Sequence, residues 1–190
     1  MIFLRKIAAL AIAFFLLTSC TPEPQKQQPM VTIIRPADFV KQEAIPLPET
    51  EPILTVTGKI QATNQDEALY LDRQTIEQLQ IVEYKIFDLF ENQQVTFEGV
   101  LFNDLMDLWQ IQPDATLLEI KALNDYTISV PIQTTREIPI LFALKQEGRY
   151  MERNYRGPAM LIVPPFENKP EIEITRQAFW IRQIESISVS

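Results

Sequence analysis

The sequence of 190 residues contains no histidine, one cysteine and four glycines, and these shortages exclude several common classes of active site. Without histidine, the chain lacks the side chain whose unperturbed pKa lies closest to neutral pH. Hydrolases that pair serine or cysteine with histidine are therefore excluded, as are zinc sites built from histidine and cysteine. The glycines are isolated from one another, so no glycine-rich loop can surround a phosphate group, which excludes Rossmann and P-loop enzymes.

Positive charge is also scarce, because 17 lysines and arginines stand against 25 acidic residues and give a formal net charge of -8. A protein that binds nucleic acid needs a basic surface, so we expect no nucleic-acid partner. Hydrophobic residues make up 46% of the chain, which is typical of a folded globule. Among the carboxylates, Asp104 and Asp107 are one helical turn apart and could recruit a hard cation. They also suit the N-terminal end of a helix, and on that interpretation we predict no metal site.

The single cysteine, Cys20, lies at the end of an apolar run from Ile7 to Leu17 that follows Arg5 and Lys6. The run is too short to cross a bilayer comfortably, which needs about 20 residues. The pattern indicates an export signal. It resembles the lipobox of bacterial lipoproteins, which implies that residues 1–19 are a signal peptide and that lipidated Cys20 begins the mature chain. An ordinary signal peptide or an uncleaved anchor is the alternative.

Residues 20–52 carry seven of the 14 prolines and no glycine, which predicts a stiff tether between the lipid and the domain. Val31 to Ile34 are apolar enough to pack on the domain, so part of this tether can be ordered. Thr21 follows the cysteine where an aspartate would signal retention in the inner membrane of Gram-negative bacteria. The resemblance therefore implies an extracytoplasmic protein, lipid-anchored in the outer membrane and facing the periplasm.

From residue 53 to residue 190 the sequence predicts one β-rich α+β domain, with mostly antiparallel or mixed sheets and short inserted helices. Strands at 53–61 and 67–72 suggest a hairpin, and Asp72 is a candidate N-cap for a short helix. Further strands are expected at 81–90 and 94–102, and Asn103 is a candidate cap for a second short helix. Later strands flank two turns, at Asn124-Asp125 and at Glu147-Gly148, and close the chain.

Six motifs occur in a fixed order from Leu54 to Val189: LTVTGKI, VTFEGVLFNDLMD, ALNDYTISVPI, ILFALKQEGR, RGPAMLIVPP and WIRQIESISV. Together they resemble the molybdopterin-binding oxidoreductase domain of the sulfite oxidase type. The similarity is greatest to its short, stand-alone exported branch. The resemblance implies the fold of that family, whereas its chemistry must be checked residue by residue.

Catalytic members of that family hold molybdenum through the pterin dithiolene and one cysteine thiolate, which precedes a Phe-x-Gly-Val turn. The corresponding segment here, residues 84–100, contains no cysteine, and a soft metal site depends on that thiolate. The family's arginine before the Val-Pro strand falls near Met160, and its pocket histidines are missing from this chain. These departures predict a domain without the oxidoreductase activity and without a cofactor. Molybdopterin held with a different ligand is the alternative.

Arg149, Arg153 and Arg156 form a positive cluster in an acidic protein, and arginines suit carboxylate or phosphate ligands. They are candidates for binding a small anion, and the alternative is a solvated hairpin edge whose charges oppose further strand pairing. Asn124 and Asp125 are added to this candidate site, and their alternative is a plain turn with Tyr126 packed against the domain.

Two tryptophans and one glycine have structural explanations. Trp109 and Trp180 are expected in the core or at its rim. Gly99 is expected to let its strand approach a helix closely beside Phe97.

Two functions remain, with a third behind them. The first is a tethered, non-catalytic module that binds a small anionic ligand or a partner protein of the cell envelope. The second is a periplasmic oxidoreductase that depends on a molybdenum cofactor with a non-cysteine ligand. A purely structural role in the envelope is the third.

Overall fold

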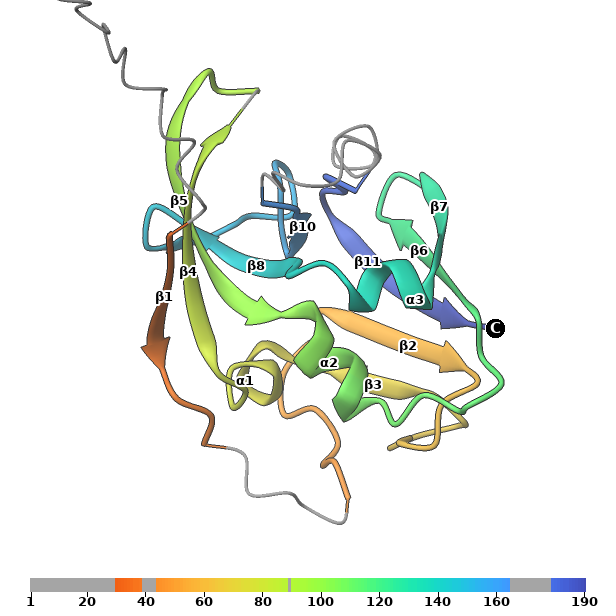
Figure 1. Cartoon of the computed structure of the whole chain (residues 1–190). Helices are drawn as coiled ribbons and strands as arrows, with labels where there is room; N and C mark the ends of the chain where they lie inside the picture. The colour runs from red at the N-terminus through yellow and green to blue at the C-terminus, as the bar shows by residue number, and fades with distance from the viewer. Residues whose placement is uncertain (1–29, 39–43, 89, 165–178) are drawn as a thin grey trace, which may run out of the picture.

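The computed structural model describes residues 30–38, 44–88, 90–164 and 179–190. In this part of the chain, two β-sheets and short helices enclose one hydrophobic core (Figure 1). The predicted signal peptide and Cys20 lie outside the described residues. No helix among the described residues is long and apolar enough to span a membrane.

The first sheet has six strands and is antiparallel throughout. Its path runs β1-β4-β5-β8-β10, and β9 pairs with β8 beside this path. The strands are β1 (Met30–Arg35), β4 (Ile81–Asp88), β5 (Gln93–Leu101), β8 (Leu141–Gln146), β9 (Arg149–Tyr150) and β10 (Met160–Ile162). The β8–β9 hairpin turns where the sequence predicts, because Glu147 and Gly148 both adopt a positive φ.

The second sheet has five strands in the order β3-β2-β11-β6-β7. They are β2 (Leu54–Gly58), β3 (Leu69–Leu71), β6 (Leu117–Ala122), β7 (Thr127–Pro131) and β11 (Ile184–Val189). The pair β11–β2 is parallel and the other pairs are antiparallel, so the sheet is mixed. The β2–β3 pairing confirms the predicted hairpin, and the two sheets confirm the β-rich α+β fold class.

Three short helices connect these strands: α1 (Arg73–Ile76), α2 (Phe102–Leu108) and α3 (Ile132–Arg136). Asp72 caps α1 as predicted, because its carboxylate accepts a hydrogen bond from the backbone N–H of Thr75. The predicted cap at Asn103 is wrong, since α2 already begins at Phe102. The Asn103 amide instead donates a hydrogen bond to the carbonyl of Arg136. A contact with a distant helix therefore replaces the local cap.

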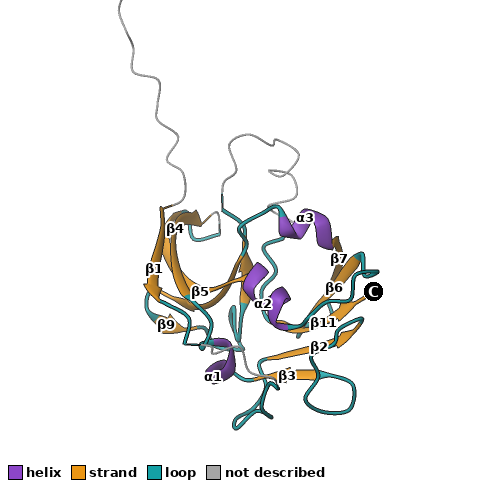
Figure 2. Ribbon diagram, turned by 60° about the horizontal axis from the view of Figure 1, so that its bottom comes forward, coloured by secondary structure: helices purple, strands orange, loops and turns teal. Residues whose placement is uncertain are grey.

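The core lies between the sheets, and α2 contributes to it from a position between them (Figure 2). Phe102 of α2 packs edge-on against Trp109, with ring centroids 5.6 Å apart, and stacks on Phe142 of β8 at 6.5 Å. Trp109 is fully buried and Trp180 is nearly so, as the sequence predicts. These aromatic contacts join α2 to β8 of the first sheet.

Gly99 allows a close approach, but the neighbour is a strand rather than the helix expected from the sequence. A Cβ atom built on Gly99 would lie 2.1 Å from the carbonyl oxygen of Phe142 and 2.8 Å from the Cα of Ala143. Both residues belong to β8, and the β5–β8 register shifts between Glu98 and Gly99. The missing side chain thus permits an irregular strand pair.

β1 lies inside the segment expected to be a tether, and it adds an edge strand to the first sheet. Its apolar side chains do not pack on the domain as expected, since Val31 is 47% exposed and Ile33 is 61% exposed. β1 is therefore held by backbone pairing with β4, and the packing expectation is wrong.

Candidate functional site

The three arginines predicted to bind an anion lie in three different environments. Arg149 is exposed on β9 and makes no ion pair with any described residue. Arg153 is also exposed and pairs with Glu51 at 2.9 Å. Arg156 is fully buried. The anion site remains a prediction, but its members are not held together as one cluster.

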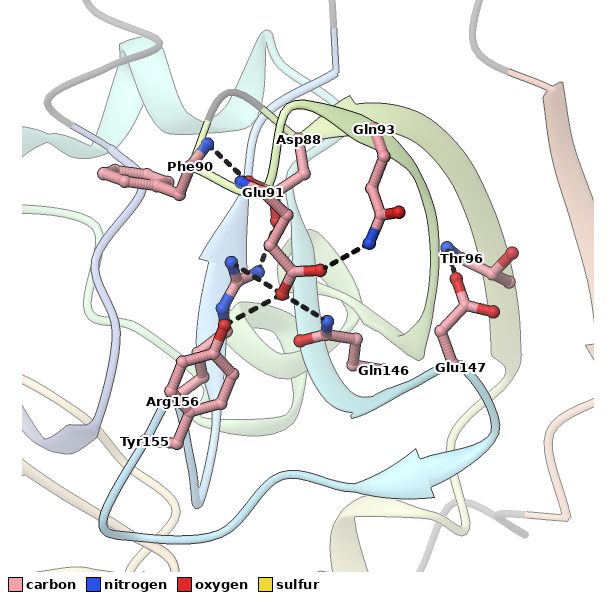
Figure 3. Close-up of polar contacts among 9 residues, drawn as sticks. All are labelled: Asp88, Phe90, Glu91, Gln93, Thr96, Gln146, Glu147, Tyr155 and Arg156. Atoms are coloured by element: carbon pink, nitrogen blue, oxygen red, sulfur yellow. Dashed lines mark hydrogen bonds and ion pairs between the residues drawn. The ribbon is translucent and has the colours of Figure 1, made fainter.

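Arg156 forms a buried ion pair with Asp88, the last residue of β4 (Figure 3). Its Nη1 atom lies 2.5 Å from Asp88 Oδ2, and neither side chain is exposed to solvent. The other carboxylate oxygen of Asp88 accepts hydrogen bonds from the backbone N–H groups of Phe90 and Glu91. One carboxylate therefore fixes both the end of β4 and the loop that carries Arg156.

Glu91 is the second acceptor beside this arginine, and Figure 3 shows it at the centre of the cluster. Glu91 Oε1 lies 3.2 Å from Arg156 Nη2, without the geometry of a hydrogen bond. The same oxygen accepts hydrogen bonds from the Gln146 amide at 2.7 Å and from the Tyr155 hydroxyl at 2.8 Å. The Gln93 amide donates to the other carboxylate oxygen at 2.9 Å.

The positive charge of Arg156 is matched by carboxylates of the protein itself. The pKa of Glu91 is lowered by hydrogen bonds from Gln146, Gln93 and Tyr155, with a smaller contribution from the positive charge of Arg156. Burial lowers the pKa of Arg156, but the hydrogen bond and charge of Asp88 outweigh this effect and the net pKa is raised. We call Asp88, Glu91, Gln146, Tyr155 and Arg156 the Arg156 cluster. Its carboxylates compensate the charge of Arg156, while the buried Nε and Nη2 atoms of this arginine make no hydrogen bond within the described part of the protein.

Asn124 and Asp125 form the turn between β6 and β7. Asn124 Oδ1 accepts a hydrogen bond from the backbone N–H of Tyr126, and Asp125 adopts a φ of 63° and pairs with Lys121 at 2.9 Å. The plain-turn interpretation expected Tyr126 to be packed, but this side chain is 53% exposed. The turn accounts for the polar groups of both residues without a ligand.

The β6–β7 hairpin and the loop of Arg156 meet at Gln183. The backbone N–H of Leu123 donates to the carbonyl of Gln183, and the N–H of Gln183 donates to the carbonyl of Arg156. Gln183 adopts a positive φ of 58° between these two bonds. The turn at Asn124-Asp125 and the loop of Arg156 are therefore linked through the backbone of Gln183. Their side chains, in contrast, bind different partners.

Two hollows open on the surface near Tyr150. One has a volume of about 230 Å³ and is lined by Arg149, Met151 and Tyr155, among others. The other has a volume of about 570 Å³ and is lined by Arg35, Arg73 and Tyr150, among others. Neither of these two hollows is lined by Asn124 or Arg156.

Carboxylates at the predicted helix are not gathered into a cation site. Asp107 pairs with Arg136 at 2.6 Å, and the pKa of Asp104 is raised by burial and by the charge of Asp107. Within the described ranges, no three His, Cys, Asp or Glu side chains are grouped so that they could hold a metal ion.

Sequence reasoning missed the partners of Arg156, although one signal for them was present. The alternation in β4 buries Val82, Tyr84 and Ile86, and it continues to Asp88. An aspartate on the buried face of a strand requires a cation or several hydrogen bonds. Glu91, Gln146 and Tyr155 carried no comparable signal, because their contacts cross between segments far apart in the sequence.

The comparisons with known proteins agree with this architecture. Residues 75–188, more than half of the chain, match the family described as the oxidoreductase molybdopterin binding domain. The chain belongs to this family. The resemblance drawn from the six motifs is therefore confirmed.

Among solved structures, the sulfane dehydrogenase SoxCD from Paracoccus pantotrophus is similar, with a TM-score of 0.53 and 13% sequence identity. The match covers 77% of this chain and 40% of that chain, so the likeness concerns the fold of one part of a longer protein. No protein with a curated description matches the chain.

The described residues of this molybdopterin-binding-type domain do not fit the group that its family name implies. The only cysteine of the chain is Cys20, so no thiolate is available from residue 30 onward. Arg156 is neutralised by Asp88 and lies beside Glu91, which leaves its charge matched before any anionic cofactor arrives. The hollow beside Arg149 is smaller than the roughly 300–1,000 Å³ of typical ligand sites. The larger hollow is within that range, but its lining contains no cysteine.

Proposed function

We propose that this protein is a membrane-anchored, extracytoplasmic lipoprotein whose molybdopterin-binding-type domain is non-catalytic and binds a small anionic ligand or a partner protein. The observation that carries the proposal is the Arg156 cluster. A buried arginine that the protein's own carboxylates already neutralise offers little to an incoming anionic cofactor, because the cofactor would have to displace a desolvated ion pair.

The cysteine content supports the same proposal. If Cys20 carries the lipid, its sulfur is a thioether outside the domain and cannot ligate molybdenum inside it. Acyl chains contribute about 0.8 kcal/mol of membrane affinity per buried methylene, so several chains hold the protein firmly at a membrane. The lipobox resemblance places that membrane outside the cytoplasm, with the domain in the periplasm.

A periplasmic oxidoreductase with a molybdenum cofactor and a non-cysteine ligand is the second candidate. Membership of the molybdopterin-binding family favours it. It would need an oxygen ligand in place of the thiolate, which changes both the softness of the site and the reaction that it supports.

The experiment that separates the two compares protein from cells that make the molybdenum cofactor with protein from cells that cannot. The full chain is expressed with its own N-terminus and purified from membranes, and thermal unfolding is followed for both samples. A cofactor that binds only the folded state raises the unfolding temperature. We expect identical unfolding curves, and a higher temperature for the first sample alone would favour the oxidoreductase.

The anchoring is tested on the same material. Mass spectrometry of the mature N-terminus should find an acylated Cys20, and Cys20→Ala should abolish that acylation and leave the chain unprocessed at this position. An unmodified cysteine in the mature, wild-type protein would refute the lipid anchor.

A further inference from the structure

The larger hollow is lined by two arginines, Arg35 and Arg73, as suits an anion site. Neither residue is among the candidates predicted from the sequence. The hollow has a volume of about 570 Å³, within the usual range for small-molecule sites. Its lining joins the end of β1, the chain before β2, α1 and β9, through Arg35, Thr50, Arg73, Glu77 and Tyr150. We call it the Arg73 hollow.

Arg73 differs from the paired arginines described above because it has no carboxylate partner among the described residues. Its Nε atom is buried and makes no hydrogen bond within the described part of the protein. A buried N–H without a partner carries a free-energy cost in the folded protein. An acceptor supplied by a ligand would remove this cost, so Arg73 has a hydrogen-bond donor that a ligand could satisfy.

Tyr150 holds the guanidinium in place. The Cζ atom of Arg73 lies 4.1 Å from the centre of the Tyr150 ring, which is a cation–π contact. The Tyr150 hydroxyl donates a hydrogen bond to Glu77 at 2.7 Å, which fixes the ring. Burial raises the pKa of Tyr150, and Glu77 adds to this shift, so the hydroxyl stays protonated at neutral pH. A stacked guanidinium keeps its N–H groups available for an acceptor in its plane.

Thr50, which also lines the hollow, is held in place by Asp72. The buried carboxylate of Asp72 accepts hydrogen bonds from the backbone N–H groups of Glu49 and Thr50 and from the Thr50 hydroxyl. The same carboxylate caps α1 through Thr75. Burial raises the pKa of Asp72, but the hydrogen bonds from Thr75, Thr50 and Glu49 outweigh it and the net pKa is lowered. Asp72 therefore stays ionised and joins the chain before β2 to the helix that begins with Arg73.

The charges of the hollow favour a small carboxylate. Arg35 adds a second cation, and its partner Asp38 is exposed, so this surface pair contributes little and can open for a ligand. Glu77 is engaged by Tyr150 and offers an acceptor to a ligand that also carries a donor. Paired N–H···O bonds from a guanidinium match the planar geometry of a carboxylate better than they match a halide.

We propose that the Arg73 hollow binds a small organic carboxylate, held by Arg73 and supported by Arg35. This inference deepens the proposed function, because it assigns the anionic ligand of the non-catalytic module to α1 and β9. The proposed site involves neither the ion pair of Arg156 nor the turn at Asn124.

The test uses the full, detergent-solubilised chain and isothermal titration with succinate, at constant chloride concentration. Succinamide, which has the same shape without the charge, is the ligand control. Arg73→Gln should weaken succinate binding by about tenfold or more, because it removes charge-assisted hydrogen bonds. Arg73→Lys keeps the charge but loses the planar pair of donors, and we expect an intermediate loss.

Arg149→Gln is the matched control, since Arg149 is also without an ion pair but lines the other hollow. Its succinate binding should equal that of the wild type. Binding that is lost in Arg149→Gln and kept in both Arg73 variants would overturn the assignment, and so would succinamide binding as tightly as succinate. Absence of saturable succinate binding would also overturn it, while leaving the unfolding comparison above to decide the proposed function separately.

Discussion

At the scale of single residues, the buried pair of Arg156 and Asp88 links the parts of the domain most firmly. It connects the end of β4 to the chain before β10, two segments separated by 68 residues. Because both groups are desolvated, each depends on the other far more than a surface pair would. Sequence reasoning singled out Arg156 as a ligand-binding residue, since an arginine's partner cannot be seen when it lies so far along the chain.

We predict that Arg156→Gln lowers the free energy of unfolding by about 3 kcal/mol or more, because it leaves the Asp88 carboxylate buried without a counter-charge. Urea denaturation measures this change. Arg153→Gln removes an exposed pair with Glu51 and should cost no more than about 1 kcal/mol. Equal effects in the two variants would show that Arg156 is not a structural residue.

Glu91 should make the domain sensitive to acid. Its pKa is lower in the folded state than in the unfolded state, so it stabilises the fold at neutral pH. This contribution is complete above the ordinary glutamate pKa of about 4.3 and is lost as the pH falls below that value toward the folded pKa.

Glu91→Gln should therefore flatten the decline in unfolding free energy below about pH 4.3 relative to the wild type. Urea denaturation at a series of pH values measures this decline in the unfolding free energy. Glu152→Gln changes an exposed carboxylate that makes no side-chain hydrogen bond or ion pair with another described residue, and it serves as the control. A wild-type pH profile in the Glu91 variant would contradict the account.

At the scale of elements, local patterns predicted the strands and the turns well. The alternation along β4 and the cap at Asp72 depend on neighbouring residues alone, and both are present in the structure. The predicted cap at Asn103 and the predicted packing of the β1 side chains were wrong because they depend on distant residues. Asn103 bonds to the end of α3, and β1 pairs with β4, so both outcomes depend on contacts with distant segments.

The irregular pairing of β5 and β8 leads to a prediction about Gly99. Gly99→Ala should destabilise the domain by about 2–3 kcal/mol or more, since its Cβ would overlap backbone atoms that cannot move aside cheaply. Thermal unfolding measures the loss. Gly148→Ala is the control, because its Cβ would meet only Glu98 Oε1 at 3.8 Å and the strain of a positive φ should cost about 1–2 kcal/mol. A smaller loss at Gly99 than at Gly148 would refute the close approach.

At the scale of the whole molecule, the family and the fold could be predicted from the sequence because six short motifs keep their order along the domain. The candidate ligand site could not, since Arg35, Arg73 and Tyr150 are distant in sequence and carry no shared motif. Our proposal of a binding module in place of a redox enzyme rests on the absence of cysteine after residue 20 and on the pairing of the buried Arg156 with Asp88.

The most direct test of this central claim is the molybdenum and pterin content of the mature protein. The wild-type chain is expressed with its export signal in cells that make the molybdenum cofactor, purified from membranes and measured by elemental analysis, with oxidised pterin measured by fluorescence. The account predicts that neither is present in stoichiometric amount. About one molybdenum and one pterin per chain would contradict it.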